Sequence, residues 1–206
     1  MRIFISGGCK NGKSTYAQHV AARRRPPKGR TCEANVLRLA KHQSNPSFPL
    51  YYVATMKAAD GEDDERIARH QDERHGWGFI TVEQPTNIED ILSSCNSNGS
   101  FLLDSLTALL ANEMFSSTGE FDENACERIT TGLTQVLSNV KNIVVVSDYI
   151  YSDAAIYDNF TENYRKSLAT LDRLAAKHCD VVLETAYTQI ITHKYPKEVW
   201  CAQQNY

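Results

Sequence analysis

The segment GGCKNGKS, residues 7–14, matches the phosphate-binding pattern G-x-x-x-x-G-K-[ST] at every fixed position. Its small residues allow backbone N–H groups to turn toward a phosphate chain, and the positive end of the next helix adds to the attraction. In this loop Lys13 would reach the β- and γ-phosphates of a nucleotide, and the Ser14 hydroxyl would bind Mg²⁺. The predicted phosphate-contacting residues are Gly7, Gly8, Cys9, Lys10, Asn11, Gly12, Lys13 and Ser14.

The sequence around this loop supports the prediction. Residues 2–6, with Ile3, Phe4 and Ile5 at their centre, predict a short buried strand directly before the loop, and residues 13–24 predict a helix directly after it. A glycine turn that matches the pattern by chance is the alternative, but the strand–loop–helix order favours nucleotide binding.

Apolar runs alternate with helix-period segments along the rest of the chain. Further strands are predicted at 50–55, 79–82, 100–104, 142–148, 180–185 and 188–194, and further helices at 63–74, 88–95, 106–115, 122–140 and 161–178. Such strands, apolar throughout and separated by helices, predict an α/β fold with a mostly parallel sheet covered by helices on both faces. We see no internal repeat and expect one nucleotide-binding domain over residues 1–206.

Residues 23–49 depart from this alternation. They contain Pro26, Pro27, Gly29 and Pro46, and only the segment ANVLRLA within them has helical character. An insertion is predicted between the first helix and the second strand. Either a surface loop or a functional lid would fit it.

Composition restricts the class of protein. Of the 206 residues 42% are hydrophobic, enough for a globular core, and the formal net charge of −3 argues against a general nucleic-acid binder. The six cysteines are scattered without a C-x-x-C pair, which fits free thiols in a reducing compartment. No apolar run approaches the roughly 18 residues of a membrane span, and the glycine loop begins too early to leave room for a signal peptide. We therefore expect a cytoplasmic protein.

The loop also predicts an acidic partner for the metal. Such a residue usually stands at the end of a buried strand, and Asp104 and Asp148 both occupy such positions. Either could instead cap the following helix, a role that Asp favours. These residues alone leave the choice between Asp104 and Asp148 open.

A histidine between two arginines is the second unusual feature. Arg66, His70 and Arg74 are four residues apart in the segment ERIARHQDER and would form one stripe on a helix. A solvated helix of mixed charge would explain the same residues. However, neighbouring positive charges lower the pKa of a histidine, and arginines can hold phosphate oxygens in pairs. A neutral His70 could then attack phosphorus and carry a phosphoryl or nucleotidyl group. His75 ranks second because it lies off the stripe.

Five segments occurring in this order are similar to one enzyme family. They are GGCKNGKS, YVATM, RIARHQDERHGW followed by TVEQP, LLDSLTALLANEMF, and ENYRKSLATLDRLAAKHCDVV near the C-terminus. Together they resemble the bifunctional adenosylcobinamide kinase/adenosylcobinamide-phosphate guanylyltransferases of cobalamin biosynthesis, over roughly residues 1–22, 50–115 and 142–193. The signature R-I-x-x-H-x-x-x-R-x-x-W beside a P-loop is far more specific than the P-loop alone.

The resemblance implies a two-step enzyme. ATP or GTP would first phosphorylate the aminopropanol hydroxyl of adenosylcobinamide. GTP would then guanylylate a histidine with release of pyrophosphate, and GMP would pass to the phosphorylated cobinamide to give adenosylcobinamide-GDP. The resemblance also implies a P-loop NTPase fold with a RecA-like core, assembled as a homo-oligomer, a trimer.

Residues are assigned from the same resemblance by motif position. His70 would be the guanylylated catalytic residue, and Lys13 would assist catalysis from the loop. Asp104 is favoured over Asp148 as the acidic group that holds Mg²⁺ together with Ser14. Beside the loop and Arg66, the nucleotide-contacting positions are Ala54, Thr55, Met56, Gln71, Asp72, Glu73, Arg74, Glu83 and Asp104.

The chain departs from the family pattern in places. Residues 147–150 read SDYI where relatives have N-E-V-G, and Asp172 and Ala169 replace an asparagine and a glycine in the last long helix. These changes bear more on the corrinoid side or the subunit contacts than on nucleotide chemistry. The alternatives are a small-molecule P-loop kinase without guanylyltransferase activity, and a nucleotide-regulated binding module without turnover.

Overall fold

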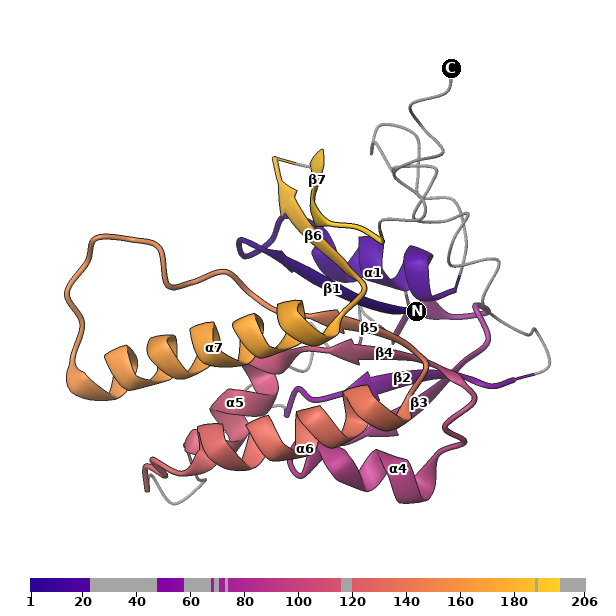
Figure 1. The fold of residues 1–206 in the computed structure, drawn as a ribbon, viewed down its shortest axis with the longest axis horizontal. Helices are drawn as coiled ribbons and strands as arrows, with labels where there is room; N and C mark the ends of the chain where they lie inside the picture. The colour runs from indigo at the N-terminus through magenta and orange to yellow at the C-terminus, as the bar shows by residue number, and fades with distance from the viewer. Residues whose placement is uncertain are drawn as a thin grey trace.

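The computed structural model describes residues 1–22, 48–57, 68, 71–72, 74–115, 120–187 and 189–196. Within these residues, seven strands form one sheet in the order β3-β2-β4-β5-β1-β6-β7 (Figure 1). Neighbouring strands are parallel except for the antiparallel pair β6 and β7. The strands are β1 (Arg2–Gly7), β2 (Leu50–Ala54), β3 (Phe79–Glu83), β4 (Ser100–Asp104), β5 (Asn142–Val146), β6 (Val181–Ala186) and β7 (Gln189–Lys194).

Helices cover both faces of the sheet. The helical elements are α1 (Lys13–Ala21), the 3-10 helix η1 (Ile88–Asp90), α4 (Ile91–Ser94), α5 (Leu106–Met114), α6 (Ala125–Asn139) and α7 (Asn159–His178). Helix α1 lies on one face, and α5, α6 and α7 lie on the other (Figure 1). In β1, Ile3 and Ile5 belong to the core beneath α1, whereas Phe4 belongs to the opposite core. The central strands β1, β4 and β5 are mostly apolar because both of their faces are buried, whereas the outer strands β3 and β7 are largely exposed. The mostly parallel sheet between helices confirms the predicted fold class.

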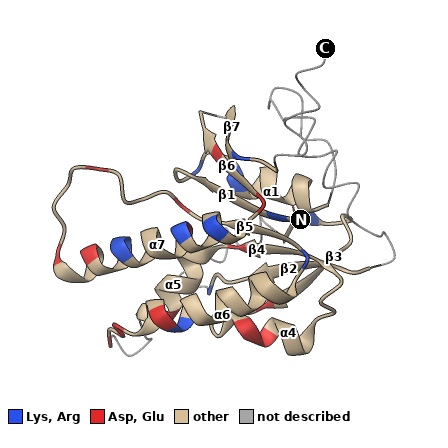
Figure 2. Ribbon diagram, viewed as in Figure 1, with Lys and Arg blue, Asp and Glu red and all other residues tan. Residues whose placement is uncertain are grey.

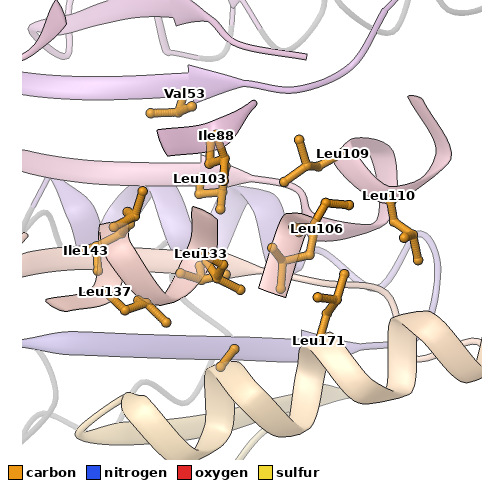
Figure 3. Close-up of a cluster of buried hydrophobic side chains, with 14 of the residues drawn as sticks. Val53, Ile88, Leu103, Leu106, Leu109, Leu110, Leu133, Leu137, Ile143 and Leu171 are labelled. Carbon is orange, nitrogen blue, oxygen red and sulfur yellow. The ribbon is translucent and has the colours of Figure 1, made fainter. Parts of the chain in front are cut away.

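The larger core lies between the sheet and helices α5, α6 and α7. Helix α6 contributes Ile129, Leu133, Val136 and Leu137, which are buried and recur at the spacing of one helical face. Figure 3 shows Leu133 and Leu137 close to Ile143 of β5. Full burial of one such side chain is worth about 1.5–3 kcal/mol relative to exposure. This packing holds the ends of the central strands in place.

The observed elements confirm most of the predicted ones, with differences at their ends. The predicted helix 88–95 is one 3-10 turn followed by the four-residue α4, and it ends because Cys95 has an extended backbone. The predicted strand 142–148 stops pairing at Val146, and Ser147 and Asp148 leave the sheet. The predicted helix 63–74 and the predicted insertion 23–49 lie largely outside the described residues.

The surface carries both signs of charge. Figure 2 shows acidic and basic residues interspersed on α6 and α7, as on a solvated helix face. Within the described ranges, no helix is both long enough and apolar enough to cross a membrane. Cys9, Cys95, Cys126 and Cys179 are free thiols, while Cys32 and Cys201 lie outside the described residues.

Candidate nucleotide-binding site

Most of the described site residues lie at one edge of the sheet. The loop that follows β1 leaves this edge, and Ala54, Glu83 and Asp104 are the last residues of β2, β3 and β4. Ala54 is the register partner of both Glu83 and Asp104, so these three residues form a row across the sheet. Because parallel strands present their carboxyl ends at the same edge, segments far apart in the chain meet there.

The glycine loop is anchored to strand β6. The Thr185 hydroxyl donates to Asn11 Oδ1 at 2.9 Å, and the Asn11 amide donates to the Thr185 carbonyl oxygen. A Cβ atom at Gly7 would lie 2.3 Å from Thr185 Oγ1, so only glycine fits there. Lys10 and Gly12 have φ angles of 56° and 83°, the left-handed conformation that tight loop turns need. The loop is therefore fixed at both its start and its middle.

Lys13 is buried at the start of α1 and directs its ammonium group back into the loop. Its Nζ donates to the Gly8 carbonyl oxygen at 3.0 Å and forms an ion pair with Asp148 Oδ1. The side chains of Lys13 and Asp148 are 7% and 19% exposed. The charged group is thus held inside the loop, next to the Gly8 carbonyl oxygen and Asp148.

Ser14 lies beside the other candidate carboxylate. Its hydroxyl donates to Asp104 Oδ1 at 3.3 Å, and the Tyr52 hydroxyl donates to Asp104 Oδ2 at 2.9 Å. Asp104 therefore contacts Ser14, whereas Asp148 contacts Lys13. The structure brings both sequence candidates to the loop, but to different residues of it.

The end of β2 is fastened to the segment after β4. Thr55 is fully buried, its hydroxyl donates to the Ser105 carbonyl oxygen at 2.8 Å, and it accepts from the Ser105 N–H at 2.7 Å. The Asn112 amide donates to the Thr55 carbonyl oxygen at 2.6 Å. Ala54 and Met56 on either side are half-buried. These bonds satisfy the polar groups of Thr55 within the protein.

The end of the predicted histidine helix packs on the α1 face of the sheet. Arg74 is buried, with its guanidinium carbon 4.0 Å from the centre of the Tyr52 ring and an Nη2 that donates to Thr81 Oγ1 at 3.3 Å. Trp77 meets His19 of α1 edge-on, at 4.7 Å between ring centres. Of the other predicted nucleotide-contacting residues, Gln71, Asp72 and Glu83 are exposed, and Arg66, His70 and Glu73 lie outside the described residues.

Two contributors to the site were missed by sequence reasoning. Tyr52 contacts Asp104 and Arg74 at once, and Thr185 closes the loop from β6. Because side chains along a strand point alternately to its two faces, the segment LYYVAT could have shown which residues share a face with Tyr52. It could not have shown that the Tyr52 hydroxyl contacts Asp104. Nothing local marks Thr185, which is 174 positions from its partner Asn11.

A buried acid lies on α7, near the segment that carries Asp148. Asp172 is 3% exposed, and its Oδ2 accepts from the Tyr151 hydroxyl at 2.9 Å. Burial raises the pKa of Asp172 to about 6, against the opposing effect of the Ser147 and Tyr151 hydroxyls, and the charge of Asp148 adds to the rise. At any given pH the folded protein therefore keeps this carboxyl protonated to a greater extent than the unfolded chain does, since burial disfavours the charged form.

We expect Asp172→Asn to raise the free energy of unfolding above pH 6 by about 2–3 kcal/mol, because a carboxyl whose pKa has risen by about two units is costly to ionise. In the wild type, the preferential protonation of the folded Asp172 carboxyl contributes to stability. This contribution is fully present below the unfolded-state pKa near 3.8 and is lost as pH rises through about 6. Urea unfolding on both sides of this window measures the difference. The exposed Asp90→Asn is the control, and an equal gain for Asp172→Asn at low and high pH would contradict the assignment.

The chain matches known proteins over most of its length. Residues 3–189 match the family described as cobinamide kinase / cobinamide phosphate guanyltransferase. The chain is also similar to the bifunctional adenosylcobalamin biosynthesis protein CobP of Pseudomonas aeruginosa, with 30% identity over 113 residues, 54% of this chain and 52% of the relative. That alignment spans about half the length of the curated relative. The family match is far longer and includes the P-loop, Asp104 and Asp148, and by it the chain belongs to the cobinamide kinase / cobinamide phosphate guanyltransferase family.

Proposed function

We propose that this protein phosphorylates the aminopropanol hydroxyl of adenosylcobinamide with ATP or GTP, and then transfers GMP from GTP to the new phosphate through a guanylylated His70. Family membership supports the two activities. The observation that carries the proposal is that two consecutive loop residues, Lys13 and Ser14, each contact a separate strand-end carboxylate, Asp148 and Asp104. A loop arranged in this way can hold a triphosphate, while its two carboxylates take different tasks.

The donors around Ser14 fit Mg²⁺. The Ser14 hydroxyl and the Asp104 carboxylate supply hard oxygen atoms 3.3 Å apart, and Mg²⁺ is usually held by one or two carboxylates together with substrate phosphates. Ser14 and Asp104 would hold the ion, and Tyr52 would keep the Asp104 carboxylate oriented through its hydrogen bond. When bound, Mg²⁺ neutralises charge on the phosphates.

In the kinase step, the loop holds the triphosphate. Its backbone N–H groups and the Lys13 ammonium surround the β- and γ-phosphates, and the positive end of α1 adds to the attraction. Because Lys13 is buried, its charge acts in a medium of low polarity, where it stabilises developing negative charge more than it would in water. The substrate hydroxyl then attacks the γ-phosphorus.

In the guanylyl step, a neutral His70 nitrogen attacks the α-phosphorus of GTP and pyrophosphate leaves. Support for this step comes from the sequence stripe of Arg66, His70 and Arg74, and from the packing of Arg74. Arg74, four positions after His70, stacks on Tyr52, whose hydroxyl contacts the same Asp104 carboxylate as Ser14. This links the segment of the stripe to the nucleotide loop. The phosphoamide is a reactive donor that can pass GMP to cobinamide phosphate.

Incubation with GTP labelled at the α-phosphorus tests the proposal. We expect acid-labile label to remain on the protein, with release of an equal amount of pyrophosphate, and to move to cobinamide phosphate when that acceptor is added. Phosphorylation of cobinamide without retained label would indicate a small-molecule kinase without guanylyltransferase activity. Tight nucleotide binding with neither phosphorylated cobinamide nor labelled protein would indicate a binding module without turnover.

A further inference from the structure

The acceptor hydroxyl must lose its proton during phosphoryl transfer, and no residue described above receives it. We propose that Asp148 is the general base of the kinase step. This inference rests on the kinase activity proposed above, and it assigns to Asp148 a task different from the metal binding assigned to Asp104.

The position of Asp148 follows from its ion pair. Asp148 Oδ1 contacts Lys13 Nζ, the group that approaches the β- and γ-phosphates in a P-loop. A carboxylate in contact with that ammonium therefore lies within one further contact of the γ-phosphate. Its side chain is 19% exposed, which leaves a path from solvent for the hydroxyl of a large substrate.

Strand order places the segment that carries Asp148 between the loop and Asp104. Strand β5 lies between β1, which leads into the loop, and β4, which ends at Asp104. Asp148 follows the end of β5 by two residues. The two carboxylates then differ in their surroundings, because Asp104 accepts from Ser14 and Tyr52 and Asp148 pairs with Lys13. Two acids in different surroundings can perform different tasks in one site.

Hydrogen bonds to α5 and to β1 hold the backbone around Asp148 in place. The Asp148 N–H donates to Thr107 Oγ1 of α5 at 2.8 Å, and the Tyr149 N–H donates to the Gly7 carbonyl oxygen at 2.9 Å. The Ser147 N–H donates to the Ile5 carbonyl oxygen at 3.1 Å. A general base must stay within hydrogen-bond reach of the proton that it removes, and these bonds hold the carboxylate beside the loop.

Phosphoryl transfer exchanges one bond to the γ-phosphorus for another. The substrate oxygen forms a bond to the γ-phosphorus, and the bond from that phosphorus to the β–γ bridging oxygen breaks. The nucleoside diphosphate leaves with the electron pair. The hydroxyl proton moves to the Asp148 carboxylate, which later releases it to water.

The variants Asp148→Asn and Asp148→Glu test this role, with Asp153→Asn as the control. Asp153 is on the same connection and pairs with Arg165, so its change alters charge equally without touching Lys13. We expect Asp148→Asn to lower kcat of cobinamide phosphorylation by about 10²–10⁴-fold, the usual contribution of general-base catalysis. Asp148→Glu should recover part of this activity.

The same preparations are then labelled with α-labelled GTP. A neutral imidazole nitrogen needs no base, so Asp148→Asn should lose far more of its cobinamide phosphorylation than of its labelling. Equal loss of both activities would show that Asp148 only holds Lys13, and would overturn the proposal, as would an Asp148→Asn kinase as fast as the wild type. A wild type that does not phosphorylate cobinamide would instead refute the proposed function, and this inference with it.

Discussion

Lys13→Ala is expected to remove both activities, lowering kcat of each by at least about 10²–10³-fold, as when a preorganised charge-stabilising group is deleted from an active site. Lys13 is the buried cation of the loop, and its ammonium is held between the Gly8 carbonyl oxygen and Asp148. In the proposed function both reactions use a triphosphate held by this loop, so both lose the group that neutralises it. Steady-state assays of cobinamide phosphorylation and of GTP labelling measure the two losses.

The control for this variant is Lys166→Ala on the exposed face of α7, which removes the same charge far from the loop in the chain. It should leave both rates at the wild-type level. Thermal unfolding of Lys13→Ala checks that the loss of activity does not result from a loss of folded protein. A kinase rate for Lys13→Ala close to that of the wild type would exclude this loop as the triphosphate site.

His70→Ala is expected to abolish protein labelling by α-labelled GTP while leaving cobinamide phosphorylation close to the wild-type rate. The phosphorus–nitrogen bond cannot form without the imidazole, whereas phosphoryl transfer uses the loop and the strand-end carboxylates. The two activities of one chain should therefore separate in this variant. Acid treatment of the labelled wild type should release the label, as for a phosphoamide.

His75→Ala is the matched control because His75 is exposed and lies off the arginine stripe. Labelling should survive this change. If labelling is instead lost in His75→Ala and kept in His70→Ala, the nucleophile is His75. If label persists in both single variants, the covalent intermediate is on another residue and the role proposed for the stripe is wrong.

The strand–loop–helix unit was predictable because its signals are local. An apolar run before the loop, the glycine pattern and the helix after it all lie within the first 22 residues, and the observed β1 and α1 confirm them. The other strands were predictable for a similar reason, since runs such as NIVVV are apolar and β-branched whatever surrounds them. Their ends were less certain: the strand predicted over 142–148 ends at Val146, two residues before Asp148.

The relation between the two candidate aspartates was not predictable. Asp104 and Asp148 have the same setting in the sequence, each at the end of a buried strand, and motif resemblance alone favoured Asp104. Their different partners depend on where β4 and β5 lie relative to β1, and on the Tyr52 hydroxyl reaching Asp104 from β2. Arg74 illustrates the same limit, because its stacking on Tyr52 joins residues from separate segments.

The sequence by itself determined most of the described elements of this protein, the pattern of its glycine loop and its family, because periodicity, turn chemistry and motif spacing act over a few residues. Only the tertiary structure decided which carboxylate meets Ser14 and which meets Lys13, and which side chains from β2 and β6 support them. The physical reason is that strand order follows from burying both faces of the sheet under helices. That burial is a property of the whole folded chain, and no short segment encodes it.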